Sequence, residues 1–168
     1  YAGMIGTAVA SRLPERLSHL VYVDAVIPER GETWGSTHAP ETRASRIASV
    51  NADPMRCLLP PDASLFGLEG ADRDWVNRRQ TPHPGGPYTD VLTFEADKVA
   101  AVARTFISCE APRLATIDAA RGRAASAQTW GGLWLARSRF VSMTTGHDPM
   151  VSAPDELTRH LLDSAAIT

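Results

Sequence analysis

The chain has little of what marks several large classes of protein. Its 168 residues hold two cysteines, Cys57 and Cys109, too few for a disulfide framework. With 17 Lys and Arg against 19 Asp and Glu, the net charge of -2 gives no basis for binding nucleic acid or an anionic membrane surface. No apolar run approaches the ~18 residues that span a bilayer. We therefore expect no nucleic-acid partner and no membrane partner.

Metal-binding and targeting patterns are also scarce. No Cys/His cluster has metal-ligand spacing, so we expect no metal ion and no organic cofactor. Cys109 lies within an apolar strand pattern, where a buried free thiol is the better interpretation, and this favours a reducing, cytoplasmic location. The chain does not begin with Met, so a targeting signal would lie outside it. The oligomeric state is left open.

What is present is the pattern of a parallel α/β sheet at both ends of the chain. Residues 1–13 are small and apolar on all sides, which predicts a helix buried against a sheet. The apolar run in residues 19–28 predicts a strand buried on both faces. Further predicted elements are a strand at 103–109, a helix at 118–128 with Asp118 as N-cap, a strand at 136–143 and a helix at 152–165 with Leu157, Leu161 and Leu162 on one face. The order predicts an α/β fold.

The middle of the chain differs in character. In residues 29–95 prolines, glycines and charges rise, with short helices expected at about 40–50 and 71–79. Large apolar side chains within this insertion indicate an ordered, mostly helical cap rather than a linker. We therefore predict a core made of residues 1–28 and 96–168 and a cap made of residues 29–95. The charge runs at 78–79 and 121–123 are predicted to be solvated.

Five short motifs, in order, resemble one family. They are YAGM at 1–4, LPERL at 13–17, LVYVDA at 20–25, TPHP at 81–84 and GHDPMVSAPDEL at 146–157. Together they resemble the α/β-hydrolase superfamily and, more narrowly, small esterases of the methylesterase and hydroxynitrile-lyase kind. The resemblance implies the C-terminal portion of an α/β-hydrolase fold, beginning one residue after the nucleophile of a G-x-S-x-G elbow.

His147 is the strongest candidate for chemistry. A triad base must titrate near neutral pH and sit on a loop beside the nucleophile, and Gly146 permits a tight turn before His147. On spacing alone, a surface histidine beside a helix start is an equal alternative. The resemblance identifies His147 as the catalytic base. The other four histidines show no partner pattern and are expected to be structural or solvated.

The acid that would orient His147 is left open among three carboxylates. Asp24 follows four apolar strand residues, where a carboxylate is costly to bury without a partner. Glu110 follows the strand after which the superfamily usually places its acid. Asp118 is the third candidate, although the next helix is expected to contain it. The resemblance to haloalkane dehalogenases favours Asp24.

Other residues are assigned to the substrate. By the resemblance, the backbone N–H of Tyr1 belongs to the oxyanion hole. Apolar side chains predicted to line an acyl or alcohol pocket, with cap packing as the alternative, are Trp34, Met55, Phe66, Trp75 and Met150.

The resemblance implies a serine hydrolase acting on small apolar carboxylic esters, with a small-molecule ester as partner. Its serine would precede Tyr1, so we expect the 168-residue chain alone to be inactive. The alternatives are a lyase of the same fold, a haloalkane dehalogenase with Asp before Tyr1, and a non-catalytic fragment or binding protein. The residue before Tyr1 discriminates the dehalogenase from the hydrolase.

Overall fold

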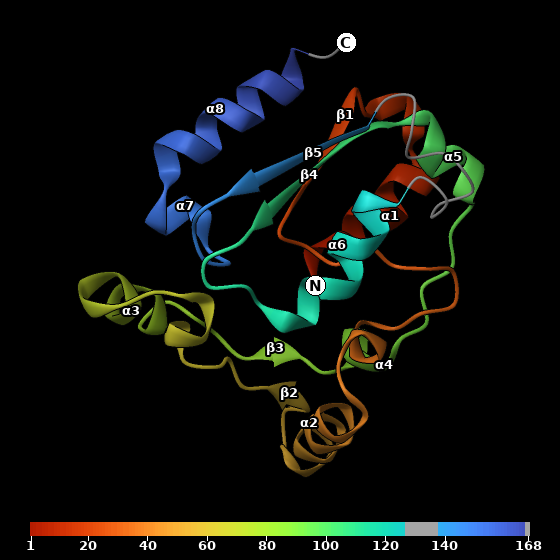
Figure 1. The fold of residues 1–168 in the computed structure, drawn as a ribbon. Coiled ribbons are helices and arrows are strands. Elements are labelled where there is room, and N and C mark those ends of the chain that lie inside the picture. The colour runs from red at the N-terminus through yellow and green to blue at the C-terminus, as the bar shows by residue number, and fades with distance from the viewer. Residues whose placement is uncertain (127–137, 167–168) are drawn as a thin grey trace.

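A parallel sheet lies at the centre of the molecule. The computed structural model describes residues 1–126 and 138–166. Three strands, β1 (His19–Val23), β4 (Ala103–Cys109) and β5 (Ser138–Met143), form the sheet in the order β1-β4-β5, with both pairs parallel. Their carboxyl ends therefore share one edge (Figure 1). The predicted α/β fold with a parallel sheet is confirmed.

Helices cover both faces of this sheet, because alternate strand residues point to opposite sides. On one face Ile107 and Met143 pack with Leu157 of α8 (Pro154–Ala165). On the other, Tyr22 and Phe106 belong to a core cluster with residues of α1 (Ala2–Arg12) and α6 (Asp118–Ala125). Figure 1 shows α8 on one side of the strands and α1 and α6 on the other. All seven residues of β4 are buried, as a central strand between two helical layers requires.

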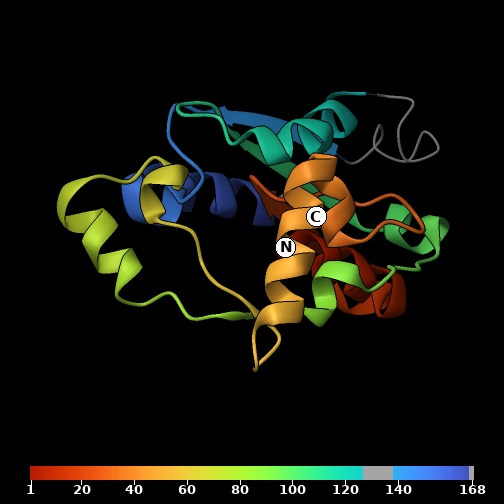
Figure 2. The same ribbon diagram turned by 90° about the horizontal axis from the view of Figure 1, so that it is seen from below.

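The cap segment enters between β1 and β4 and lies beyond the carboxyl ends of the strands. It appears below the sheet in Figure 1, and Figure 2 shows it from below. Its elements are η2 (Trp34–Thr37), α2 (Pro40–Ala52), β2 (Cys57–Leu58), η3 (Ala63–Phe66), α3 (Gly70–Asn77), β3 (His83–Pro84) and α4 (Gly86–Thr89). The chain then returns to the sheet through α5 (Ala96–Ala101). The two expected helices are present, while the division into core and cap domains stays a prediction.

Several predicted boundaries need correction. The first strand ends at Val23 rather than Pro28, because Asp24 adopts a φ of 41° and leaves the extended conformation. Asp118 is the first residue of α6, not its N-cap, which is Ile117. Leu162 is 65% exposed and therefore does not share the buried face of Leu157. Parts of the predicted helix at 118–128 and strand at 136–143 lie outside the described residues.

No helix in the described part of the chain has the length and apolar character needed to cross a membrane.

Gly3 allows α1 to approach the segment after β1. A Cβ on Gly3 would overlap the carbonyl oxygen of Val26, which is backbone and cannot rotate away. We expect Gly3→Ala to lower the free energy of unfolding of the full-length protein by about 2–3 kcal/mol, as overpacking does. Thermal melting measures the change.

Gly6 provides the matched control in the same helix. Its added methyl group would meet only a side-chain carbon of Leu20, at 3.4 Å. Since alanine favours a helix over glycine by about 1 kcal/mol, Gly6→Ala should be neutral or stabilising. Equal melting temperatures for Gly3→Ala and Gly6→Ala would contradict the close approach at Gly3.

Candidate active site

A histidine and a buried carboxylate meet at the carboxyl edge of the sheet. Nδ1 of His147 lies 2.8 Å from Oδ2 of Asp24. The Asp24 side chain is fully buried, whereas that of His147 is 26% exposed. Since Asp24 accepts at Nδ1, the imidazole carries its proton there and presents Nε2 as an acceptor. No hydrogen bond to Nε2 is recorded from the described residues.

The loop after β5 places His147 against the cap. The backbone N–H of His147 donates to the carbonyl oxygen of Phe66, at 2.9 Å. Gly146 makes this approach possible, because a Cβ there would overlap the same carbonyl group. The rings of Phe66 and His147 also lie 5.3 Å apart between centroids. The loop that contains Gly146 and His147 is thus joined directly to η3.

Asp24 is held where β1 ends. Its backbone N–H continues the sheet by donating to the carbonyl oxygen of Ile107, at 2.7 Å. The left-handed φ of 41° then turns the chain, a conformation that Asp tolerates better than most residues. Oδ1 accepts from Nη2 of Arg121 at 2.7 Å and from the backbone N–H of Cys109 at 3.2 Å. These donors compensate the buried charge.

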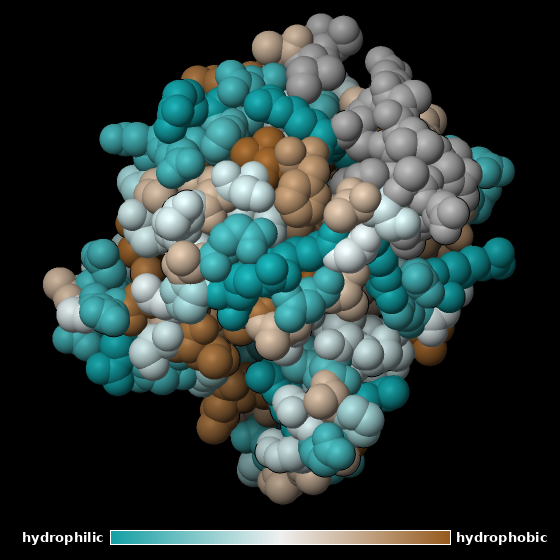
Figure 3. Space-filling model, viewed as in Figure 1, coloured by the Kyte–Doolittle hydropathy of each residue, from teal (hydrophilic) through white to brown (hydrophobic). Residues whose placement is uncertain are grey.

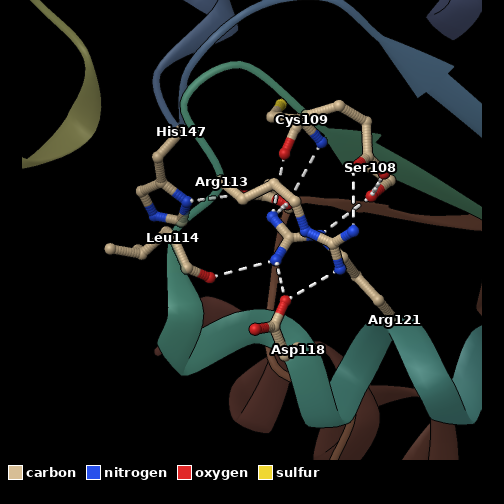
Figure 4. A network of polar contacts seen from close by, with 9 residues as sticks. Ser108, Cys109, Arg113, Leu114, Asp118, Arg121 and His147 are labelled. Carbon is tan, nitrogen blue, oxygen red and sulfur yellow. Dashed lines mark hydrogen bonds and ion pairs between the residues drawn. The ribbon is translucent and has the colours of Figure 1, made fainter.

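Arg121 extends this network into α6, as Figure 4 shows. Its side chain is buried, so the interpretation of residues 121–123 as a solvated charge run is wrong at this position. Besides Asp24, the guanidinium contacts Asp118 at 2.9 Å through Nη1. Asp118 also binds Arg113, at 2.9 Å. No pattern in the sequence indicates this role, because a stretch with two arginines and an aspartate within six residues is typical of an exposed helix.

The two alternative acids lie elsewhere. Glu110 accepts from the hydroxyl of Ser108 at 2.6 Å and pairs with Arg113 at 3.3 Å. Asp118 is half exposed and engages only arginines among its recorded contacts. The bond from Arg113, with a smaller contribution from Arg121, lowers the pKa of Asp118. The structure brings neither Glu110 nor Asp118 to His147.

A cavity of about 390 Å³ opens beside the Asp24–His147 pair. Of the residues expected to bind substrate, Trp34 and Phe66 line this cavity together with Tyr1. Apolar surface lies between the α3 segment and α2, where β2 and η3 are found (Figure 3). The cavity therefore combines the Asp24–His147 pair and a few further polar side chains with largely apolar walls, the usual composition of a small-molecule site.

Three predicted pocket residues are not at the cavity. Met55, Trp75 and Met150 are 80%, 46% and 54% exposed, and none of them is among the lining residues. Met55 lies in the turn before β2, and Trp75 lies beneath the guanidinium of Arg79, 4.3 Å from its ring centroid. The apolar character of these side chains alone does not indicate whether they face the cavity or the solvent.

Polar cap residues that the sequence did not single out do line the cavity, namely His38, His83 and Arg46. Burial, followed by the charge of Arg46, lowers the pKa of His38, so this imidazole is neutral near pH 7. The expectation that His38 and His83 are merely structural or solvated is too narrow, since both face the space beside His147.

Tyr1 stands at the start of α1 and at the wall of the cavity. It is the N-cap residue of α1, and its ring packs against those of Trp34 and His83, at centroid distances of 5.2 and 4.5 Å. The backbone nitrogen of Tyr1 lies in a buried environment. The backbone nitrogen at the helix start is therefore removed from bulk water at the place where a helix dipole favours negative charge.

Cys109, whose backbone N–H binds Asp24, is not suited to act as a nucleophile. Burial, with a smaller contribution from Asp24, raises the pKa of the Cys109 thiol to about 12, so the thiol stays protonated at neutral pH. Residues 1–126 and 138–166 contain no group of three or more His, Cys, Asp or Glu able to hold a metal ion. The arrangement as it stands is a proton acceptor oriented by a carboxylate.

Comparison with known proteins extends these observations. No family model matches the chain. A curated relative, the carbendazim hydrolyzing esterase of Nocardioides sp. (strain SG-4G), is 32% identical over 171 residues, covering 96% of this chain and 66% of the relative. The chain thus spans slightly less than two thirds of that relative's length.

Solved structures resemble this fold at low identity. An extracellular alpha/beta-hydrolase from a Paenibacillus species, described as homologous to tobacco salicylic acid binding protein 2, matches with a TM-score of 0.74 at 15% identity, over 96% of this chain and 67% of its own. A methylesterase from Arabidopsis matches with a TM-score of 0.67 at 16% identity, over 99% of this chain and 66% of its own. A pyrethroid hydrolase from Sphingobium faniae matches with a TM-score of 0.64 at 16% identity, over 96% of this chain and 66% of its own.

Proposed function

Because the chain belongs to the α/β-hydrolase superfamily, we propose that the protein is a carboxylic-ester hydrolase in which His147 is the base and Asp24 orients it. The observation that carries this proposal is the 2.8 Å contact between Nδ1 of His147 and Oδ2 of Asp24 at the wall of an apolar cavity. The relative named as an esterase supports the ester class.

The proposed nucleophile is a serine immediately before Tyr1. Its hydroxyl would attack the ester carbonyl while Nε2 of His147 takes the hydroxyl proton, and His147 would then return that proton to the leaving alcohol. Water would release the acid in a second step with the same proton transfers. Support for this position comes from Tyr1 and His147, which line one cavity.

The backbone N–H of Tyr1 is proposed to donate to the oxyanion that forms on the carbonyl oxygen. Its place at the start of α1 supports this, because orphan N–H groups and the helix dipole favour negative charge there. A second donor would come from a segment outside this chain. Without the proposed serine and the second donor, residues 1–168 alone are expected to give no turnover above background.

The proposed substrates are small esters with an apolar or aromatic part. Trp34 and Phe66 supply aromatic wall, and the volume of about 390 Å³ suits a small molecule. Carbendazim, which the relative's name states that it hydrolyses, is a natural first compound for this protein as well.

The test is direct hydrolysis by the full-length protein. Purified protein would be assayed with p-nitrophenyl acetate, p-nitrophenyl butyrate and carbendazim, beside a variant whose proposed serine is alanine. Turnover that depends on the serine supports the proposal. Turnover unaffected by its removal, or none with any ester, would show that the assigned nucleophile or the reaction class is wrong.

Trp34 and Trp75 form a matched pair for locating the substrate. Trp34 lines the cavity, whereas Trp75 lies outside it and is 46% exposed. We expect Trp34→Ala to raise KM for an aromatic ester about tenfold, through lost aromatic contact area, with a smaller change in kcat. Trp75→Ala should leave both constants within about twofold. Steady-state kinetics measures both constants for each variant. Equal effects of the two changes would show that the substrate does not contact Trp34.

A further inference from the structure

We propose that Arg121 is a positioning residue, which orients the Asp24 carboxylate toward His147 and sets, through its charge, the pH range in which His147 acts as a base. The catalytic consequence rests on the proposed ester hydrolysis. The contacts that carry the inference lie within this chain and do not involve the nucleophile.

The two oxygens of Asp24 have separate partners. Oδ1 binds Nη2 of Arg121 at 2.7 Å and the N–H of Cys109 at 3.2 Å, while Oδ2 faces Nδ1 of His147 at 2.8 Å. A carboxylate is planar, so fixing Oδ1 with two donors fixes the direction of Oδ2. Arg121 thereby determines where the imidazole finds its acceptor.

Arg121 is itself immobilised. It is 4% exposed, and it donates five hydrogen bonds, to Asp24, Asp118, the hydroxyl of Ser108 and the carbonyl oxygens of Cys109 and Leu114. Figure 4 shows the guanidinium reaching from α6 to the end of β4. The five donors of a guanidinium form a rigid fork, so lysine at this position would keep the charge but not the geometry.

The charge of Arg121 acts on His147 through Asp24. A cation near an imidazole disfavours the imidazolium, so loss of this cation should let His147 hold its proton to higher pH. The other titratable groups on the sheet side of this region are Cys109 and Glu110 at the end of β4, Arg113 in the following loop, Asp118 on α6 and Asp148 beside His147. On the cap side, His38, Arg46 and His83 line the same cavity as His147. Arg113 is half exposed and is bound by Glu110 and Asp118, whereas Arg121 is the buried cation that contacts Asp24.

The experiment compares Arg121→Gln with Arg121→Lys in the full-length protein. It measures the pH dependence of kcat/KM, the titration of the His147 imidazole by NMR, and the melting temperature. For Arg121→Gln we expect kcat/KM near pH 7 to fall about tenfold or more. The acid limb and the imidazole midpoint should both rise by about one pH unit. For Arg121→Lys we expect a smaller loss of kcat/KM and an acid limb within a few tenths of a pH unit of wild type.

Arg123 supplies a control on the same helix. It pairs with Glu32 at 2.7 Å and has no recorded contact with Asp24. Arg123→Gln therefore removes one positive charge and some stability from α6 without touching the carboxylate. Its melting temperature should fall, while the acid limb and the midpoint of His147 stay in place.

The outcomes separate a positioning role from a merely structural one. If Arg121→Gln lowers the melting temperature but leaves the acid limb and the imidazole midpoint unchanged, the proposal is overturned. An equal shift in Arg123→Gln would overturn it too. If Arg121→Gln does not fold, Arg121→Lys decides: reduced kcat/KM with a wild-type acid limb supports the proposal, and full kcat/KM contradicts it. If the full-length protein cleaves no ester, the proposed function is wrong. The NMR titration midpoint of His147 still tests the effect of Arg121, because it does not depend on ester hydrolysis.

Discussion

Replacing His147 with alanine in the full-length protein is expected to lower kcat/KM for ester hydrolysis by at least about 10³-fold. The imidazole is oriented by Asp24 at 2.8 Å and presents its other nitrogen at the cavity. Without the imidazole, the attacking hydroxyl loses its proposed proton acceptor. Initial rates with p-nitrophenyl butyrate at several pH values measure the loss, with circular dichroism to verify folding.

His83 is the matched control for this change. It also lines the cavity, and its ring lies 4.5 Å from that of Tyr1, but it has no recorded contact with Asp24. His83→Ala should therefore act mainly on KM, by about tenfold or less. A His147→Ala variant that keeps more than a tenth of wild-type kcat/KM would remove His147 from the role of base.

The second large effect concerns the acid. Asp24→Asn should lower kcat by about 10³ to 10⁴-fold, because an amide cannot stabilise the imidazolium and can favour the wrong tautomer of His147. Glu110→Gln should change kcat less than about threefold, since Glu110 binds Ser108 and Arg113 instead. Parallel kinetics of the two variants tests the assignment. If both variants lose the same fraction of kcat, the 2.8 Å contact does not identify Asp24 as the acid.

Stability must be separated from chemistry in that comparison. Asp24 is half of a buried ion pair, so Asp24→Asn leaves Arg121 with only the half-exposed Asp118 as its anion and is expected to destabilise the protein by about 3–5 kcal/mol. Kinetics should therefore be run well below the melting temperature of each variant. Asp118→Asn removes the half-exposed partner of Arg121 and leaves Asp24 in place, so it controls for disturbing the arginine.

The sheet was predictable because buried parallel strands read as continuous apolar runs. The segment at 103–109 matches β4 residue for residue, and it is buried throughout. The segment at 19–28 was too long, because the apolar residues after Val23 are also buried but in an irregular conformation. Apolar residues indicate that a segment is buried, but they do not indicate where a strand ends. Here the strand ends at the backbone turn at Asp24.

The site was predictable where chemistry needs a residue at an element's end, and less so where it depends on packing between distant segments. His147 follows β5 and Asp24 follows β1, and the sequence indicated both as candidates, although the resemblance rather than the spacing favoured them. The choice between Asp24 and Glu110 depended on the direction of each side chain, which spacing does not encode. Arg121 lies 97 residues from Asp24, and its neighbours in sequence resemble a solvated surface.

The hydrogen bond from the His147 backbone to Phe66 has a mechanical consequence. A Cβ on Gly146 would overlap the carbonyl oxygen of Phe66, and a Cβ on Gly67 would overlap the ring of Pro112. Any motion that lifts this corner of the cap must break that bond, which holds the backbone of His147, whereas the imidazole has a separate bond to Asp24. A substitution that loosens η3 should therefore act on the position of the loop that contains His147 as well as on the cap.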